Sequence, residues 1–470
     1  MARLKLVLFY SAMVAVAVGL FLLIRDSGSA IVVPSAQGRA RFGTGLGWKA
    51  PGLMGHVLLA LVVIVVCARA LGLLFQRFNQ PPVIGEMIAG IMLGPSLLGR
   101  LAPGVFASLL PPSVAPYLSV IANLGVILYM FLVGVELNTS LLRARTHASV
   151  AISHASIVLP FLLGSALALK LYPIFSTSDV PFVAFSMFMG VAMSITAFPV
   201  LARILTDRKM HTSQLGAVAL GCAAVDDVTG WCLFALVVSV TAARPGHALI
   251  TLGLTACFIL AVILFVRPAA VWFARRHASL RRPSQNSIVI VCIALLVAAL
   301  TTERIGIHAL FGAFLVGALI PHGSQLARDI REKFEDLVVV LFLPVFFAFT
   351  GMRTQIGLVH GLRDWFICLV IIAVASIGKF GGGTLAARLT GLTWRESGSL
   401  GILMNTRGLM ELIVLNVGMD LGVLSPALFA MLVIMAIVTT VATTPVLHAL
   451  TSGSEAETFA QPVSVGEESA

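Results

Sequence analysis

The chain has 470 residues, of which 59% are hydrophobic and only 11% are charged. A soluble protein of this size could not cover its surface with so few charges, and the continuously apolar segments exclude the alternating pattern of a transmembrane barrel. The net charge of +11 would suggest a nucleic-acid partner for a soluble chain, but in a membrane protein it reflects basic cytoplasmic loops beside anionic lipid. We therefore predict an all-α polytopic membrane protein that contacts the lipid bilayer and no nucleic acid.

Apolar segments long enough to cross a bilayer follow one another along the chain. We expect about fourteen spans, or about thirteen if the first is a cleaved signal segment. They lie near residues 5–24, 54–75, 82–98, 117–135, 149–172, 180–205, 214–241, 247–266, 287–302, 306–320, 334–351, 364–389, 397–418 and 425–447. The chain is thus divided into an N-terminal apolar segment with an external loop (1–53), a membrane domain (54–447) and a short cytoplasmic tail (448–470).

Basic residues are clustered in alternate loops. The clusters are Arg143 with Arg145, Arg208 with Lys209, a group of Arg267, Arg275, Arg276, Arg281 and Arg282, and Arg328 with Arg331 and Lys333. The loops between these clusters carry mostly single charges. Because loops rich in arginine and lysine face the cytoplasm, this pattern predicts the orientation of the spans.

An internal duplication relates the two halves of the chain. The segment PPVIGEMIAGIMLGPSLLG at 81–99 is echoed by RIGIHALFGAFLVGALIPHG at 304–323, and the spans that follow each segment correspond in order. The copies run from about 81–241 and about 304–447, with five spans each. Because two further spans separate them, the second copy is inverted in the membrane. Inverted repeats are typical of secondary transporters, whose site lies near the midplane where the repeats meet.

One span in each copy is predicted to be interrupted. The residues that mark the breaks are Pro199 in 180–205, and Asn405 with Gly408 in 397–418. Proline removes a backbone donor and opens the helix about one turn upstream, which frees carbonyl groups near Val191–Thr196, a stretch that includes Ser194. Two interrupted helices that cross near acidic residues would offer carbonyl and hydroxyl oxygens to a small hard cation.

Two adjacent carboxylates, Asp226 and Asp227, lie inside an apolar run from 216 to 240. Each aspartate at a helix centre opposes membrane insertion by roughly 2.5–3.5 kcal/mol. Since packing gains nothing from such a pair, we expect it to have a chemical task. For two neighbouring acids in a membrane, that task is the handling of protons or cations.

Five sequence motifs occur in a distinctive order: IGEMIAGIMLGPSLLG, FLVGVELN, SITAFPVLARIL, AAVDDVTGW and MNTRGLMELIVLN. Together they resemble the monovalent cation:proton antiporters, in the branch of bacterial sodium–proton antiporters and plant cation/proton exchangers. The resemblance covers residues 54–447. It implies an inverted-repeat fold with two broken crossing helices, a mobile core domain and a dimerisation domain, and hence a homodimer. The family's acidic pair falls on Asp226 and Asp227, and its basic residue falls on Lys379.

The two aspartates are expected to divide their tasks. Asp227 is expected to bind the proton and the transported monovalent cation, with Ser194 and Thr196 supplying further oxygens. Adjacent residues of a helix point about 100° apart, so the second carboxylate can face a neighbouring helix. Asp226 is expected to pair with Lys379, because a lone lysine in an apolar helix needs a partner. The alternative is that Lys379 extends toward the cytoplasmic side.

Three further charged residues within predicted spans are candidates for a gating or structural role. Arg407 and Glu411 are spaced i, i+4, so they either brace each other or gate the ion path. Glu86 lies near the start of its span and is a candidate for a gating or structural role at the interface.

We therefore predict a secondary active transporter, rather than an enzyme, that exchanges Na⁺ or K⁺ for protons by alternating access. It is expected to need no cofactor and to lie in a bacterial inner membrane. Proton and cation would compete for Asp227, and only an occupied, neutralised site would cross easily. The alternative is a sodium-coupled symporter of a small organic solute, which can share the inverted-repeat architecture.

Overall fold

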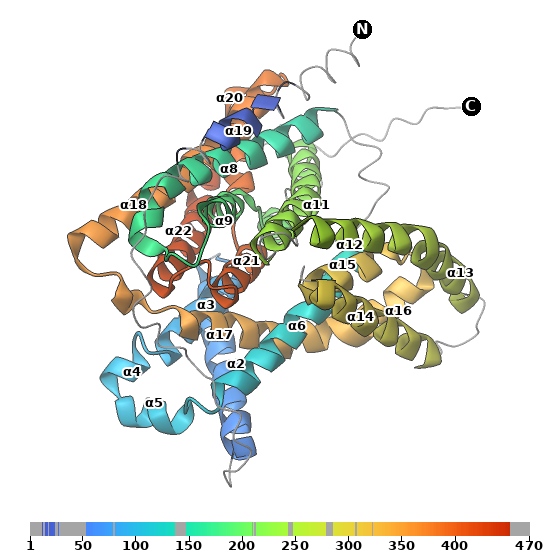
Figure 1. Cartoon of the computed structure of the whole chain (residues 1–470), viewed down its shortest axis with the longest axis horizontal. Helices are drawn as coiled ribbons and strands as arrows, with labels where there is room; N and C mark the ends of the chain where they lie inside the picture. Colours follow the sequence, from blue (N-terminus) through green and yellow to red (C-terminus); the bar gives the residue numbers. More distant parts are fainter. Residues whose placement is uncertain are drawn as a thin grey trace. The chain divides into compact units, whose positions relative to one another are not determined.

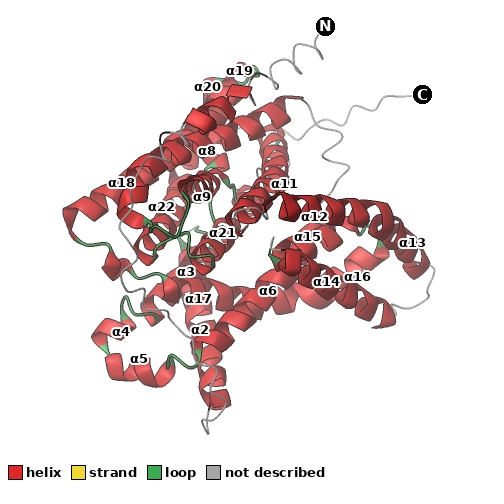
Figure 2. Cartoon of the chain, in the orientation of Figure 1, coloured by secondary structure: helices red, strands yellow, loops and turns green. Residues whose placement is uncertain are grey.

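A computed structural model of the chain consists of helices joined by short loops (Figures 1 and 2). It describes residues 53–451, apart from 79, 137–146, 209, 211–212, 243–247, 279–284, 306–307 and 322, and a few positions (12, 15–16, 18–23 and 27) near the N-terminus. Most of the predicted segment 1–53, the tail from 452 and several of the basic loops, including Arg143 and Arg145, lie outside the described residues.

The helices follow one another along the chain with short connections. They are α2 (Leu53–Arg77), α3 (Pro82–Leu93), α4 (Leu98–Leu101), α5 (Pro103–Leu109), α6 (Ala115–Glu136), α8 (His147–Phe175), α9 (Phe182–Ser194), α10 (Phe198–Asp207), α11 (Gln214–Ala242), α12 (Ala248–Ala261), α13 (Arg267–Ala278), α14 (Gln285–Ile305), α15 (Ala309–Leu319), α16 (Gln325–Leu337), α17 (Leu343–Arg353), α18 (Gly361–Ser376), α19 (Gly382–Leu389), α20 (Trp394–Met404), α21 (Leu409–Asp420) and α22 (Pro426–Thr451). Short turns of a different pitch are η1 (Val262–Val266), η2 (Val338–Phe342) and η4 (Ile377–Gly381), which are π-helical, and η3 (Ile356–Leu358), which is 3₁₀.

Helices stand at each of the thirteen predicted spans between 54 and 447. In the described part of the chain, however, 10 are long and apolar enough to cross a membrane, or 11 with the pair α20–α21, which bends by 42° at its break. Of the thirteen predicted spans between 54 and 447, the two that this criterion leaves out are 180–205 and 306–320. Their helices α9 and α15 are apolar but short, and in the first of these spans the helix is interrupted between α9 and α10.

The chain folds into two compact units, each built from separate stretches of sequence. One unit, called unit 1 here, comprises Met1–Arg39, Arg145–Gly230 and Ile356–Ala470. Unit 2 comprises Ala40–Ala144 and Trp231–Gln355. Each unit thus draws on both copies of the internal duplication, and α11 runs from unit 1 into unit 2.

Unit 2 contains two close helix crossings with small residues at the contact. Helix α3 crosses α17 where Gly90 lies against the backbone of Ala348, and α6 crosses α15 where Gly134 lies against the backbone of Phe314. Helices α3 and α6 are the first two spans of one copy, whereas α15 and α17 are the first two spans of the other. Each first span therefore packs on the second span of the opposite copy, as an inverted duplication requires.

Unit 1 contains both interrupted spans. Helix α8 packs along α9, α19 packs on α20, and α18 packs on α22. The span that follows η3 is regular in α18, widens in η4 and returns to α-helix in α19. Lys379 is the central residue of this widened turn.

Candidate functional site

The two interrupted helices meet at their breaks in unit 1. Helix α9 ends at Ser194 and α10 begins at Phe198, one residue before Pro199, while α20 ends at Met404 and α21 begins after the extended Gly408. Both interruptions lie where the sequence predicts them. The breaks are joined by a backbone hydrogen bond of 3.0 Å from the Ala197 N–H to the Thr406 carbonyl oxygen.

Asp226 is a buried carboxylate surrounded by hydrogen-bond donors. Its Oδ1 accepts from the Ser153 hydroxyl at 2.6 Å, and its Oδ2 accepts from the Thr196 hydroxyl at 2.5 Å. The Ser156 hydroxyl lies 3.2 and 3.3 Å from the two oxygens. The negative charge of Asp226 is therefore balanced by donors from α8 and from the break that follows α9.

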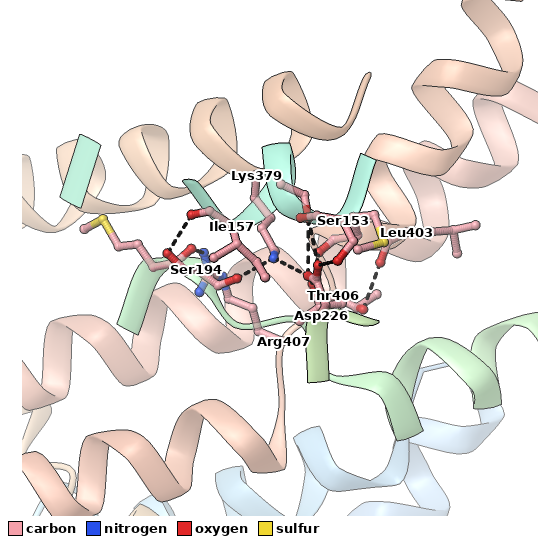
Figure 3. Close-up of polar contacts among 12 residues, drawn as sticks. Ser153, Ile157, Ser194, Asp226, Lys379, Leu403, Thr406 and Arg407 are labelled. Atoms are coloured by element: carbon pink, nitrogen blue, oxygen red, sulfur yellow. Dashed lines mark hydrogen bonds and ion pairs between the residues drawn. The ribbon is translucent and has the colours of Figure 1, made fainter. Parts of the chain in front are cut away.

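Lys379 supplies the positive charge beside this carboxylate. Its Nζ lies 2.8 Å from Asp226 Oδ2, and both side chains are completely buried. Nζ also donates to the carbonyl oxygen of Ser194 at the end of α9. Figure 3 shows the lysine directed at the aspartate. The expected ion pair is present, and the alternative in which the lysine extends to the cytoplasmic side is wrong because no part of its side chain is exposed.

Asp227 has different surroundings from its neighbour. Only 5% of the residue is exposed, and its Oδ1 accepts no hydrogen bond from the described residues. A buried carboxylate oxygen without a donor is costly unless a proton, water or cation occupies it. The charge of Asp226 is thus compensated by its ion pair, whereas Asp227 has an oxygen that is free to bind a ligand.

The two hydroxyl groups expected beside Asp227 lie elsewhere. The Ser194 hydroxyl donates to the carbonyl oxygens of Gly190 and Ile157, at 2.6 and 3.0 Å. The Thr196 hydroxyl contacts Asp226 and, at 3.0 Å, the Met404 carbonyl oxygen. A role of these side chains as cation ligands stays a prediction.

Arg407 joins the two interrupted helices. Its guanidinium donates to the carbonyl oxygens of Ala192 and Met193 at 2.9 and 2.8 Å, and it lies 3.2 Å from Glu411 Oε1. The carbonyls belong to the last turn of α9, where a helix leaves acceptors unsatisfied and favours positive charge. This contact braces α9 against α21, whereas a gating role of Arg407 and Glu411 stays a prediction.

The remaining predicted residues occupy two places. Asn405 is buried at the break after α20, and its side-chain oxygen accepts no hydrogen bond from the described residues. Glu86 belongs to α3 of unit 2 and is 7% exposed, with its side chain next to Gly72 of α2. It is therefore buried between helices of its own unit.

Sequence reasoning missed Ser153 and Ser156. Their spacing of i, i+3 on α8 places both hydroxyls on one helix face, and both are fully buried. The signal was the polar pair in AISHASIV, but serine is common in membrane helices, where it bonds to its own backbone.

Comparisons with known proteins agree with one another. Residues 57–452 match the family model described as sodium/hydrogen exchanger, transmembrane. The chain is 43% identical to the Na⁺/H⁺ antiporter NhaS4 of Synechocystis over 83% of this chain and 96% of that protein. It is 40% identical to the cation/H⁺ antiporter 18 of Arabidopsis thaliana and 33% identical to the K⁺/H⁺ antiporter 1 of Saccharomyces cerevisiae, over 84% and 82% of this chain. The chain spans about half the length of these two relatives, 48% and 45%.

A solved structure has the same fold. The sodium proton antiporter MjNhaP1 of Methanocaldococcus jannaschii superposes with a TM-score of 0.60, over 87% of this chain and 97% of that chain, at 14% sequence identity. At this level of identity the likeness concerns the arrangement of the helices.

Proposed function

Since the chain belongs to the sodium/hydrogen exchanger family, we propose that it exchanges a monovalent cation, Na⁺ or K⁺, for protons across a membrane. It is a multi-pass transporter and not an enzyme. The observation that carries this proposal is the unlike pair of acids at the crossing of two broken helices. Asp226 has a lysine and three hydroxyl groups around it, while an oxygen of Asp227 is buried and has no donor among the described residues.

Asp227 is the proposed carrier of both substrates. A proton and an alkali cation each neutralise one carboxylate, so they compete for the same group. Carbonyl oxygens freed at the two breaks, with Thr196 and Ser194 beside them, would complete a cation site of the kind that broken helices form. Because proton and cation exclude each other, the apparent KM for the cation should rise as the pH falls.

Coupling follows from the energy of charge in hydrocarbon. An empty, ionised site is costly to move through the membrane core, whereas a site neutralised by a proton or a cation is not. The side chains of the proposed site all belong to unit 1, so a movement of that unit would carry the site as one body. Alternating access of this kind produces exchange and prevents leakage.

Three further assignments follow from the family resemblance. We propose that residues 54–447 form the membrane domain, that the membrane is the inner membrane of a bacterium, and that two copies assemble as a homodimer. The symporter alternative fits less well, because an organic solute would need polar groups to bind it in addition to those that bind the cation.

The test is the Asp227→Asn substitution. Asparagine keeps the size of the side chain but cannot carry a negative charge, so cation-dependent proton movement in everted vesicles should fall to the level of vesicles without the protein. Asp364→Asn, at a half-buried aspartate that accepts a hydrogen bond from the His360 N–H, is the matched control and should exchange like the wild type. Exchange at the wild-type level in the Asp227 variant would refute the assignment.

A further inference from the structure

Asn405 lies at the second helix break, directly after the end of α20. The carbonyl oxygen of Met404, the residue before it, accepts from the Thr196 hydroxyl at 3.0 Å, and the same hydroxyl donates to Asp226. The carbonyl oxygen of Thr406, the residue after it, accepts from a backbone N–H of the first break at 3.0 Å. Figure 3 draws Thr406 in the same cluster of polar contacts as Asp226. Asn405 is therefore held between two contacts to the first break, one residue away from a chain of hydrogen bonds that leads to the acid pair.

Polar groups of the neighbouring residues have partners, whereas the Asn405 amide oxygen has none among the described residues. The Ser194 hydroxyl donates to two carbonyl oxygens, and the Thr440 hydroxyl contacts both the N–H and the carbonyl of Arg407. The Glu411 carboxylate lies 3.2 Å from the Arg407 guanidinium, which supplies the opposite charge. Asn405 is only 3% exposed, and its Oδ1 accepts no hydrogen bond from the part of the chain that the structure describes. This oxygen is thus buried and open to a ligand.

The backbone does not require an asparagine at this position. Asn405 has φ −83° and ψ 6°, a conformation with negative φ that residues other than asparagine and glycine also adopt. A buried amide oxygen without a donor costs stability. A residue that costs stability and meets no need of the backbone is expected to have a function.

The chemistry of the amide indicates a cation as its ligand. The amide oxygen has two lone pairs and no net charge, and hard cations take amide and carboxylate oxygens as ligands. Asp227 offers a negative charge, and its Oδ1 is also buried without a donor among the described residues. A neutral second oxygen replaces part of the hydration shell that the cation loses and adds no charge, so the occupied site remains neutral. A proton, in contrast, needs only one carboxylate oxygen.

We propose that Asn405 is a ligand of the transported monovalent cation, and that its amide oxygen, together with Asp227, sets which alkali cation the site prefers. This inference rests on the proposed exchange function. The number and field strength of the neutral oxygens decide how well a site replaces the hydration shell of one cation relative to another. Removal of the amide should therefore affect alkali cations of different size unequally, whereas a structural defect would affect all of them alike.

The experiment measures the apparent KM for Li⁺, Na⁺, K⁺ and Rb⁺ in proteoliposomes that contain the full chain, at one fixed pH. In Asn405→Ala the KM for the preferred cation should rise about tenfold or more, since a polar contact to a charged group is lost, and the ratios between the KM values should change. The maximal rate should stay within about twofold of wild type, because only binding is weakened. Binding is also read from the unfolding midpoint in detergent, which a ligand of the folded state raises. At equal ionic strength with choline chloride as reference, the preferred cation should raise this midpoint less in the variant than in the wild type.

Asn416→Ala is the matched control. Asn416 lies on α21 in the same interrupted span and is also buried, but its amide donates to the Leu412 carbonyl oxygen of its own helix at 2.9 Å. Its loss should leave the KM values and their ratios as in the wild type. If Asn405→Ala yields no folded protein, Asn405→Leu takes its place, since leucine is similar in size and removes a polar group that has no partner. This variant should be as stable as the wild type without cation and should show the same changes in KM.

Two results would overturn the proposal for Asn405. One is a folded alanine or leucine variant whose KM values coincide with those of the wild type. The other is a rise of KM by the same factor for every cation, which a merely structural role would produce. Wild-type vesicles that exchange neither Na⁺ nor K⁺ for protons at any pH would instead refute the proposed function, so the two failures are distinguishable.

Discussion

At the scale of single residues, Asp226 and Asp227 share a helix but have opposite surroundings. Asp226 faces Lys379 and the hydroxyl groups of α8, so its charge is compensated within the protein. Asp227 has a buried oxygen without a donor among the described residues. Breaking a buried ion pair by removing one partner costs roughly 3–5 kcal/mol, so the loss of either Asp226 or Lys379 should destabilise this part of the protein.

Replacing Lys379 by methionine tests whether its charge takes part in the cycle. We expect Lys379→Met to move less net charge per cation exchanged, because the lysine can no longer release and rebind its partner during transport. The measurement is the current of proteoliposomes on a solid-supported membrane, compared with the cation flux. Lys170→Met, at an exposed position of α8, is the control. If the Lys379 variant exchanged cations and remained as electrogenic as the wild type, the lysine's role would be only structural.

The sequence predicts the acids and the lysine because each is expensive in an apolar span. It does not predict Ser153, since a hydroxyl in a membrane helix is satisfied by its own backbone as readily as by a distant side chain. For the same reason, the expectation that Ser194 and Thr196 supply oxygens beside Asp227 could not be derived from the sequence alone. The structure directs the Thr196 hydroxyl to Asp226 and the Ser194 hydroxyl to carbonyl groups of Gly190 and Ile157.

At the scale of elements, the broken helices stabilise each other's ends. Arg407, which stands at the second break, donates to the last carbonyls of α9. The Thr440 hydroxyl of α22 also contacts both the N–H and the carbonyl of Arg407, at 3.0 and 2.7 Å. Backbone groups at membrane depth need such partners because no lipid can satisfy them. Proline and glycine in the sequence predict the breaks, whereas the π-helical turns have no comparable local signal.

The close crossing of α6 and α15 depends on the absence of a side chain at Gly134. A Cβ at this position would collide with the carbonyl oxygen of Phe314, so Gly134→Ala should destabilise the protein by about 1–3 kcal/mol through overpacking. The measurement is the thermal unfolding midpoint in detergent. Gly253→Ala on α12, where nothing lies within 4 Å of the added atom, should leave the midpoint unchanged or raise it slightly. Equal midpoints for the two variants would contradict the tight crossing.

At the scale of the whole molecule, the sequence predicts the internal duplication. It does not predict how the spans of the two copies are distributed between the two compact units. Motif order identifies the two copies, and the crossings of α3 with α17 and of α6 with α15 each join the first span of one copy to the second span of the other. The sequence carries no sign that each compact unit takes spans from both copies, because the contacting residues lie far apart along the chain, as Gly90 and Ala348 or Gly134 and Phe314 do. Hydropathy likewise predicts where apolar segments lie, but the breaks decide which are long enough to cross.

The proposed homodimer can be checked on the purified protein. Helices α12 and η1 carry a row of exposed apolar side chains that includes Leu254, Leu260, Leu264 and Phe265, and either lipid or a second copy can cover it. Light scattering in detergent, corrected for the bound micelle, should give the mass of two chains of 49.6 kDa. A mass of one chain across the accessible concentration range would count against the dimer.

Because Lys379 lies in a widened turn, the number of residues in this turn sets the direction in which the lysine side chain points. A π-helical turn holds one residue more than the α-helical turn that it replaces, and neighbouring residues of a helix are separated by about 100° around its axis. Between Ile377 and Gly381, this additional residue therefore fixes the angular offset between the segments on either side. An insertion or deletion of a single residue here would swing the ammonium group away from Asp226 while leaving every side chain identity intact. Natural variation in this stretch should thus be limited to changes that preserve the residue count.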